Sequence, residues 1–144
     1  MVRHFEHVTI AVRDLAAAKR FFALLGFEEE ISTVIAGAAM SAYMGVPGIE
    51  AEHVTLVLKG ATPRLEVQLL KYRQPAIPDD PGPARLDRLG FNHICFAVDD
   101  LAAEVVRLEA SGIRRRNEIM EFHGRKLVFL AGPEGVVVEL SERH

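Results

Sequence analysis

The chain has 144 residues, of which 49% are apolar and 26% are charged, and its formal net charge is −3. This length and balance are typical of one soluble globular domain with a real core, and they exclude a disordered or fibrous chain. The weak negative charge predicts that the protein does not bind nucleic acid. The single cysteine excludes an internal disulfide and predicts a cytoplasmic protein. No apolar run approaches the ~18 residues of a membrane span, so no membrane segment is expected.

Two stretches of the chain match each other without a gap. Residues 5–16 read FEHVTIAVRDLA, and residues 91–102 read FNHICFAVDDLA. Every matched pair is 86 positions apart, which is the distance from His7 to His93. Such a constant offset indicates an internal repeat, and a repeat is the first feature to establish because it decides the fold.

The first copy predicts a strand, a helix and three further strands. Asp14 is placed to cap the N-terminus of the helix, apolar residues recur at helical spacing, and Gly26 ends it. An insertion around residues 36–52, rich in Gly, Ala and Met, is expected to form a loop. The strand-like runs that follow the helix cover residues 27–34, 53–59 and 65–72.

The second copy repeats this order after a linker at residues 74–90 that is rich in proline. Its last strand aligns with the last strand of the first copy at an offset of 71, which matches Glu139 with Gln68. The chain therefore predicts an α+β fold of two βαβββ modules, module one at residues 4–73 and module two at 91–142. The three strands after the second helix are expected at residues 113–118, 126–130 and 136–141.

Alternation along the strands places a polar set on the side of the sheets away from the helices. It contains two histidines and carboxyl or amide side chains at matching positions of the repeat. Nitrogen and oxygen ligands of this kind suit Zn, Ni, Co, Mn or Fe as divalent ions. A histidine satisfied by backbone groups explains either imidazole alone, but the matching positions favour a metal site. The candidate ligands are His7, Gln68, His93 and Glu139, with Glu66 in reserve.

Several other polar residues are left without a role. The alternation of His53 is ambiguous because it starts its strand. Cys95, which follows His93 by two residues, is interpreted as a small filler side chain, since no base or helix N-terminus is evident beside it. Lys71 and Arg73 are candidate rim charges for an anionic substrate, but a solvated strand end is favoured.

The motifs that open and close the two copies resemble the vicinal oxygen chelate superfamily. His-x-x-x-x-Val-x-Asp-Leu opens both copies, VQLLKY closes the first and GPEGVVVEL closes the second. The superfamily includes glyoxalase I, methylmalonyl-CoA epimerase, extradiol dioxygenases, fosfomycin-resistance enzymes and bleomycin-binding proteins. The resemblance implies one domain over residues 1–144, with an open, cup-shaped, eight-stranded sheet, helices outside and a metal inside.

Residue by residue, the resemblance places the metal ligands on the set already found, His7, Gln68 or Glu66, His93 and Glu139. It implies a glyoxalase-like lyase or isomerase that removes a proton next to a carbonyl of a small substrate, with Glu139 as the base. Epimerases of the superfamily carry a further carboxylate on the third strand, where this chain has Thr55. A homodimer is expected, because the sheet must close its cup.

Two other functions stay open at this point. An iron(II) extradiol-type dioxygenase would use two histidines and one carboxylate, but Gln68 in the second ligand position disfavours it. A non-catalytic protein that sequesters a drug or metabolite would not need the complete ligand set.

Overall fold

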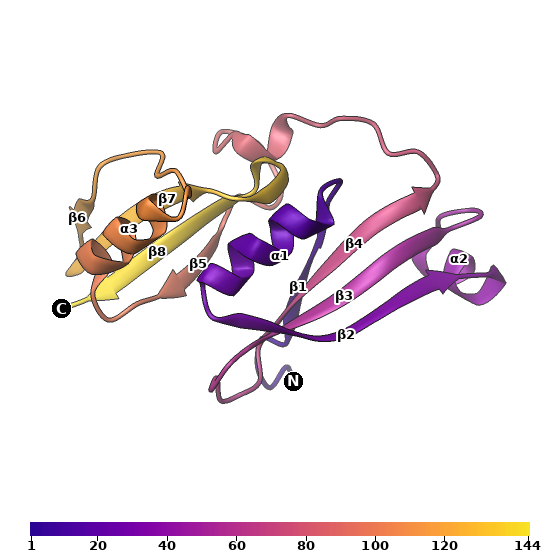
Figure 1. Ribbon diagram of the computed structural model, residues 1–144, viewed down its shortest axis with the longest axis horizontal. Helices are drawn as coiled ribbons and strands as arrows, with labels where there is room; N and C mark the ends of the chain where they lie inside the picture. The colour runs from indigo at the N-terminus through magenta and orange to yellow at the C-terminus, as the bar shows by residue number, and fades with distance from the viewer. The chain divides into compact units, whose positions relative to one another are not determined.

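The computed structural model describes residues 1–144 and divides them into two compact units. Unit 1 comprises Met1–Asp79 and unit 2 comprises Asp80–His144. In each unit one long helix lies against a four-stranded sheet (Figure 1). None of the helices combines the length and the apolar character that crossing a membrane would require.

Unit 1 is built around a sheet with the strand order β1-β4-β3-β2. β1 and β4, the first and last strands, pair in parallel, whereas the other neighbours are antiparallel. The elements are β1 (His7–Ala11), α1 (Leu15–Leu24), β2 (Phe27–Ala36), α2 (Ala38–Met44), β3 (Glu50–Leu58) and β4 (Glu66–Gln74).

Unit 2 repeats this topology with the strand order β5-β8-β7-β6. Its first and last strands again pair in parallel, and the register is the same. Thr9 lies opposite Gln68 in unit 1, and Cys95 lies opposite Glu139 in unit 2. The elements are η1 (Gly82–Ala84), β5 (Ile94–Ala97), α3 (Leu101–Ala110), β6 (Met120–Phe122), β7 (Arg125–Ala131), η2 (Pro133–Gly135) and β8 (Val137–Arg143).

The predicted α+β class and the order βαβββ are thereby confirmed for both copies. The eight strands are hydrogen-bonded as two four-stranded sheets. The predicted helix caps are also confirmed. The Asp14 carboxylate accepts a hydrogen bond from Ala17 N at 2.9 Å, and Asp100 accepts one from Ala103 N at 3.0 Å.

The core of each unit lies between its helix and its sheet. Phe22 on α1 and Leu69 on β4 are fully buried in unit 1, as are Leu101 on α3 and Leu140 on β8 in unit 2. Side chains of Leu or Phe size contribute about 1.5–3 kcal/mol each when fully buried. The apolar faces therefore hold each sheet against its helix and leave the opposite face free for polar side chains.

Two elements differ from the sequence-based prediction. The insertion contains a seven-residue helix, α2, where a loop was expected. Residues 113–118 do not form a strand, since only Arg115 makes an isolated bridge, to Leu130, and the strand β6 begins later, at Met120. Ile113 is buried, but its neighbours are three arginines, so this segment has one apolar anchor instead of an alternating pattern.

Candidate functional site

The open face of the unit 1 sheet carries polar side chains from three neighbouring strands. His7 and Thr9 project from β1, and Glu66 and Gln68 project from β4 at paired positions of the register. His53 on β3 belongs to the same face, because its Nε2 lies 3.0 Å from Gln68 Oε1. The alternation that was ambiguous in the sequence is thus resolved.

The amide of Gln68 is held by three neighbours. Its Oε1 accepts from His53 Nε2 at 3.0 Å and from Thr9 Oγ1 at 3.4 Å, and its Nε2 donates to Glu66 Oε1 at 3.3 Å. Because Glu66 offers only an acceptor to the amide, the NH₂ group is directed to Glu66 and the oxygen to β1 and β3. Gln68 therefore presents its oxygen, the atom that could bind a cation, on the side of His53 and Thr9.

Glu66 is engaged by a cation. Arg64 Nε donates to Glu66 Oε2 at 3.0 Å, and the two terminal nitrogens of Arg64 bind Glu30 at 2.8 and 3.0 Å. Burial raises the pKa of Glu66, but the hydrogen bonds from Arg64 and Gln68 outweigh it and hold the pKa below its ordinary value. Its side chain is only 13% exposed. The carboxylate is thus charged and already paired, which makes Glu66 a weaker candidate ligand than Gln68.

The two candidate histidines are anchored in the same way. His7 Nδ1 donates to Glu6 Oε2 at 3.1 Å, and His93 Nδ1 donates to Asn92 Oδ1 at 2.7 Å. The Asn92 amide is itself oriented, because its Nδ2 donates to the Leu86 carbonyl at 2.8 Å. Glu6 and Asn92 occupy matching positions of the repeat. In both imidazoles Nε2 is the nitrogen that does not contact the preceding side chain, and binding through Nε2 is a usual arrangement of metal-binding histidines.

In unit 2 the second histidine meets the candidate base. His93 Nε2 lies 3.1 Å from Glu139 Oε2, so that a proton or a metal ion can lie between the two atoms. The Glu139 side chain is 14% exposed. The ring of His93 contacts Phe129 edge to face, with centroids 5.1 Å apart, which fixes the plane of the imidazole.

Cys95 lies beside Glu139 in the register of β5 and β8. Burial, and after it the neighbouring Glu139 carboxylate, together raise the pKa of its thiol to about 11. A thiol of this kind is protonated at neutral pH and is a poor nucleophile. A catalytic role for Cys95 is therefore disfavoured, although the residue is exposed and does not fill the core as the sequence suggested.

The five candidate residues thus fall into two half-sites. Unit 1 brings His7, Glu66 and Gln68 to one sheet face, and unit 2 brings His93 and Glu139 together. In neither unit do three or more His, Cys, Asp or Glu side chains gather where they could hold one metal ion. A single site with all four ligands stays a prediction.

Sequence reasoning missed His53 and the two anchors, Glu6 and Asn92. The offset of 86 residues was the signal for the anchors, since both precede the candidate histidines by one residue. The apolar residues Val54 and Leu56, which the structure buries, were the signal for His53, because alternation from them places it on the open face.

Comparisons with known proteins agree with this architecture. Residues 6–129 match the model of the family described as Glyoxalase/Bleomycin resistance protein/Dioxygenase superfamily. An ethylmalonyl-CoA/methylmalonyl-CoA epimerase from Cereibacter sphaeroides is 29% identical over 99% of this chain and 99% of its own. A glyoxalase family protein from Bacillus cereus has a similar structure, with a TM-score of 0.88, 23% identity and coverage of 99% and 95% of the two chains.

A further solved structure of the same fold contains a metal. The fosfomycin resistance protein FosX from Listeria monocytogenes was solved with Mn(II) and sulfate. It matches this chain with a TM-score of 0.63 and 17% identity, over all of this chain and 95% of its own.

Proposed function

Because this chain belongs to the glyoxalase/bleomycin resistance protein/dioxygenase superfamily, we propose that it is a metal-dependent lyase or isomerase. Its substrate would be a small molecule with vicinal oxygens, and the reaction would begin with removal of a proton next to a carbonyl group. The observation that carries the proposal is the matched anchoring of His7 and His93. Two imidazoles whose Nδ1 atoms are both held by a preceding side chain are oriented to bind through Nε2.

The donor set fits a first-row divalent ion. His7 and His93 would supply nitrogen, and Gln68 and Glu139 would supply oxygen, which suits Zn, Ni, Co, Mn or Fe. The distance of 3.1 Å between His93 Nε2 and Glu139 Oε2 suits two neighbouring ligands of one ion. Such an ion, if bound by these residues, would supply positive charge that stabilises the negative charge developing on the substrate oxygens.

Glu139 is the proposed base. The position that matches it in the repeat is occupied by Gln68, which cannot accept a proton at neutral pH, and Glu66 is neutralised by Arg64. Glu139 is therefore the candidate carboxylate that remains to accept the substrate proton on Oε1 or Oε2. Gln68, held by His53 and Thr9, would orient the substrate without exchanging a proton.

Substitution of the base separates metal binding from turnover. Glu139→Gln keeps an oxygen ligand but loses the basicity, so metal should be retained with weaker affinity while turnover falls by about 10²–10⁴-fold. His7→Ala should lose metal and activity together. His4→Ala is the matched control, because His4 is exposed and bonds only to the adjacent Phe5 carbonyl. Metal analysis of protein purified without chelator gives the first readout.

Incorporation of solvent deuterium into 2-oxo, hemithioacetal or acyl-thioester substrates gives the second readout. We expect the wild type to exchange hydrogen for deuterium at the carbon next to the carbonyl, and we expect Glu139→Gln to lose this exchange. Full activity in metal-loaded Glu139→Gln would exclude Glu139 as the base. Activity that needs oxygen and iron(II), with no exchange, would assign a dioxygenase, and tight substrate binding with neither reaction would assign a sequestering protein.

A further inference from the structure

The N-terminus of α3 in unit 2 is occupied by a carboxylate from the last strand. Glu142 Oε2 accepts a hydrogen bond from Leu101 N at 2.7 Å, and Glu142 Oε1 accepts one from Lys126 Nζ at 3.0 Å. The first N–H groups of a helix have no partner within the helix and carry partial positive charge. Glu142 therefore acts as a built-in anion at this helix end.

The matching place in unit 1 has the opposite charges. Lys71 occupies the position of Glu142, and Glu52, its partner in the register, occupies that of Lys126. The backbone confirms the match, because Val12 N donates to Leu70 O at 2.7 Å and Val98 N donates to Ser141 O at 2.9 Å. The amide of Leu15, the counterpart of Leu101, has no such carboxylate.

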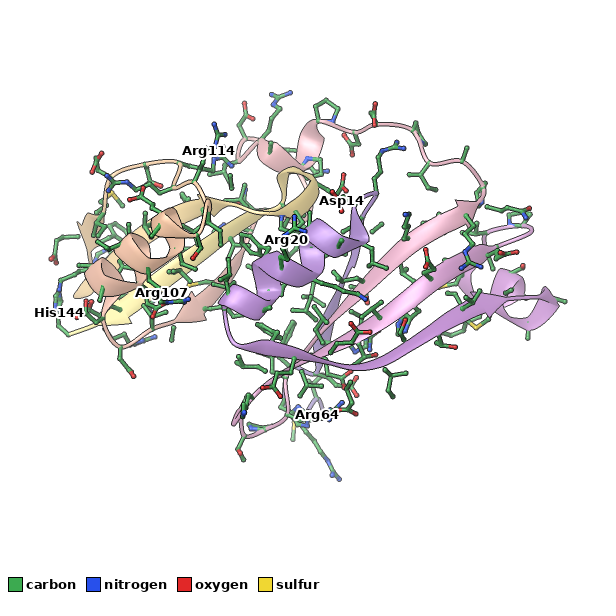
Figure 2. The ribbon with its side chains drawn as sticks, in the orientation of Figure 1. Asp14, Arg20, Arg64, Arg107, Arg114 and His144 are labelled. Carbon is green, nitrogen blue, oxygen red and sulfur yellow. The ribbon has the colours of Figure 1, made fainter.

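A hollow of about 470 Å³ lies at this helix end. Three of the residues that line it are cations, and two, Asp14 and Glu52, are carboxylates. The positions in unit 2 that match the three cations hold Asp99, Val105 and Glu142. Arg13 pairs with Asp79 at 2.9 Å and Lys19 with Glu29 at 2.9 Å, but Lys71 makes no ion pair. Figure 2 labels Asp14, the cap of α1, at the start of that helix. The lining includes Arg13, Asp14, Leu15, Lys19, Glu52 and Lys71.

We propose that unit 1 binds a small oxyanion in this hollow. At the corresponding helix end of unit 2, the carboxylate of Glu142 takes the place of that ligand. One oxygen of the ligand accepts from Leu15 N, in the place that Glu142 Oε2 takes at Leu101, and the Lys71 ammonium pairs with the anion. Arg13 and Lys19 are paired with Asp79 and Glu29, so Lys71 is the cation that remains for the ligand. The hollow is larger than a bare phosphate or carboxylate group, so the ligand is a small carboxylated or phosphorylated molecule.

The oxyanion site is separate from the candidate metal face. Lys71 follows the buried Leu69 by two residues, so it projects toward α1, whereas Gln68 projects to the other side of β4. This placement excludes Lys71 as a rim charge on the open face. The proposal therefore does not depend on the proposed reaction.

The direct test measures the NMR chemical shifts of the backbone amides while inorganic phosphate replaces chloride at constant ionic strength. A second series uses acetate in place of phosphate. The Leu15 and Ala16 amides should shift in a saturable way with a dissociation constant of about 1–10 mM. Lys71→Ala should weaken binding by about fivefold or more. Lys59→Ala is the matched control, since Lys59 lies outside the hollow and pairs with Glu28 on the surface. Tighter phosphate than acetate binding would assign phosphorylated ligands, and the reverse would assign carboxylates.

A charge exchange provides the second test. Glu52→Lys combined with Lys71→Glu reproduces the arrangement of unit 2, so the new carboxylate should cap Leu15 and the protein should lose its response to phosphate. Its melting temperature without phosphate should equal or exceed that of the wild type. Three results would each overturn the proposal. The first is a saturable shift of Leu15 that persists in this double variant, and the second is a shift that Lys71→Ala leaves unchanged. The third is the absence of any saturable shift of Leu15 and Ala16 in the wild type.

Discussion

Glu66 and Gln68 lie two residues apart on one face of β4, but their hydrogen bonds give them different roles. Arg64 neutralises Glu66, and Glu66 in turn accepts the NH₂ group of Gln68. The amide oxygen is thereby turned toward His53 and Thr9. Glu66 is best interpreted as the residue that orients Gln68, with Gln68 as the candidate ligand.

Substitution at the two positions should therefore give different results. Glu66→Gln should keep metal affinity within about tenfold of wild type, whereas Gln68→Ala should lose more, because a candidate ligand is removed. Calorimetric titration of metal-free protein with Zn²⁺ and Mn²⁺ measures both. Loss of metal in Glu66→Gln as complete as in His7→Ala would make Glu66 the ligand.

The thiol of Cys95 should react slowly although the residue is exposed. With a pKa of about 11, little thiolate is present at pH 8, so alkylation by iodoacetamide should be about tenfold or more slower than for an ordinary cysteine. Glu139→Gln removes a neighbouring negative charge that raises this pKa, and it should speed the reaction. Unfolded protein gives the ordinary rate for comparison. Equal rates in the folded and unfolded chains would contradict the elevated pKa.

The candidate ligands could be found from sequence because the repeat aligns them in two segments, each of which needs no internal gap. His7 with His93 and Gln68 with Glu139 follow from two constant offsets and from strand alternation. The partners of these residues could not be found in this way. Arg64 reaches Glu30 on β2 across 34 residues of sequence, and the register of β2 and β3 is shifted between Glu29 and Ile31. Such contacts depend on tertiary geometry that no local pattern encodes.

The helix α3 should be stabilised by Glu142 in a way that depends on pH. Hydrogen bonds from the Leu101 amide and from Lys126 hold the pKa of Glu142 below its ordinary value of 4.5. A carboxylate with a lowered pKa contributes stability above pH 4.5, and the contribution is lost as pH falls through the folded-state pKa. Glu142→Gln should therefore lower the melting temperature most at neutral pH, with a difference that shrinks in acid.

Melting curves of Glu142→Gln and wild type between pH 7 and pH 3 measure this effect. Glu28→Gln is the matched control, since Glu28 is exposed and pairs only with Lys59 at 3.2 Å. A difference between wild type and Glu142→Gln that stays constant across the range would show that charge on Glu142 is not involved.

Elements with a buried face were predictable, and elements without one were not. The caps at Asp14 and Asp100 and the apolar stripes of α1 and α3 were visible in the sequence because each helix packs on a sheet. The helix α2 has no buried residue and lies between Gly37 and Gly45, so its seven residues resemble a loop. The strand β6 is exposed throughout its three residues, and it also lacks a pattern.

The whole chain is predicted to form a homodimer. Phe5 and Phe91 stand at matching positions of the repeat, two residues before the candidate histidines, and they are 60% and 54% exposed. Large apolar side chains exposed beside functional residues are typical of surfaces that bind a partner. Light scattering at micromolar concentration should give twice the chain mass of 15.9 kDa. A mass of one chain would contradict the prediction, and Phe5→Ser combined with Phe91→Ser should favour the monomer.

Subunit mixing identifies the chains that close the metal site. His7→Ala and His93→Ala are each predicted to lose metal. If a site combines unit 1 of one chain with unit 2 of the other, a mixed dimer of these variants contains one intact site and recovers metal binding. If each chain closes its own site, mixing recovers none.

The parallel pairing of the first and last strands also affects the order in which the chain can fold during synthesis. Unit 1 closes when β4 pairs with β1, so it can be complete before unit 2 has left the ribosome. Unit 2 closes only with β8, the last of its four strands along the chain, and this strand carries both Glu139 and Glu142. Pairings between strands distant in sequence form slowly. The proposed base and the cap of α3 would therefore be set in place in the step that closes unit 2, and a chain that stalls before residue 137 would contain a finished first unit without the proposed base.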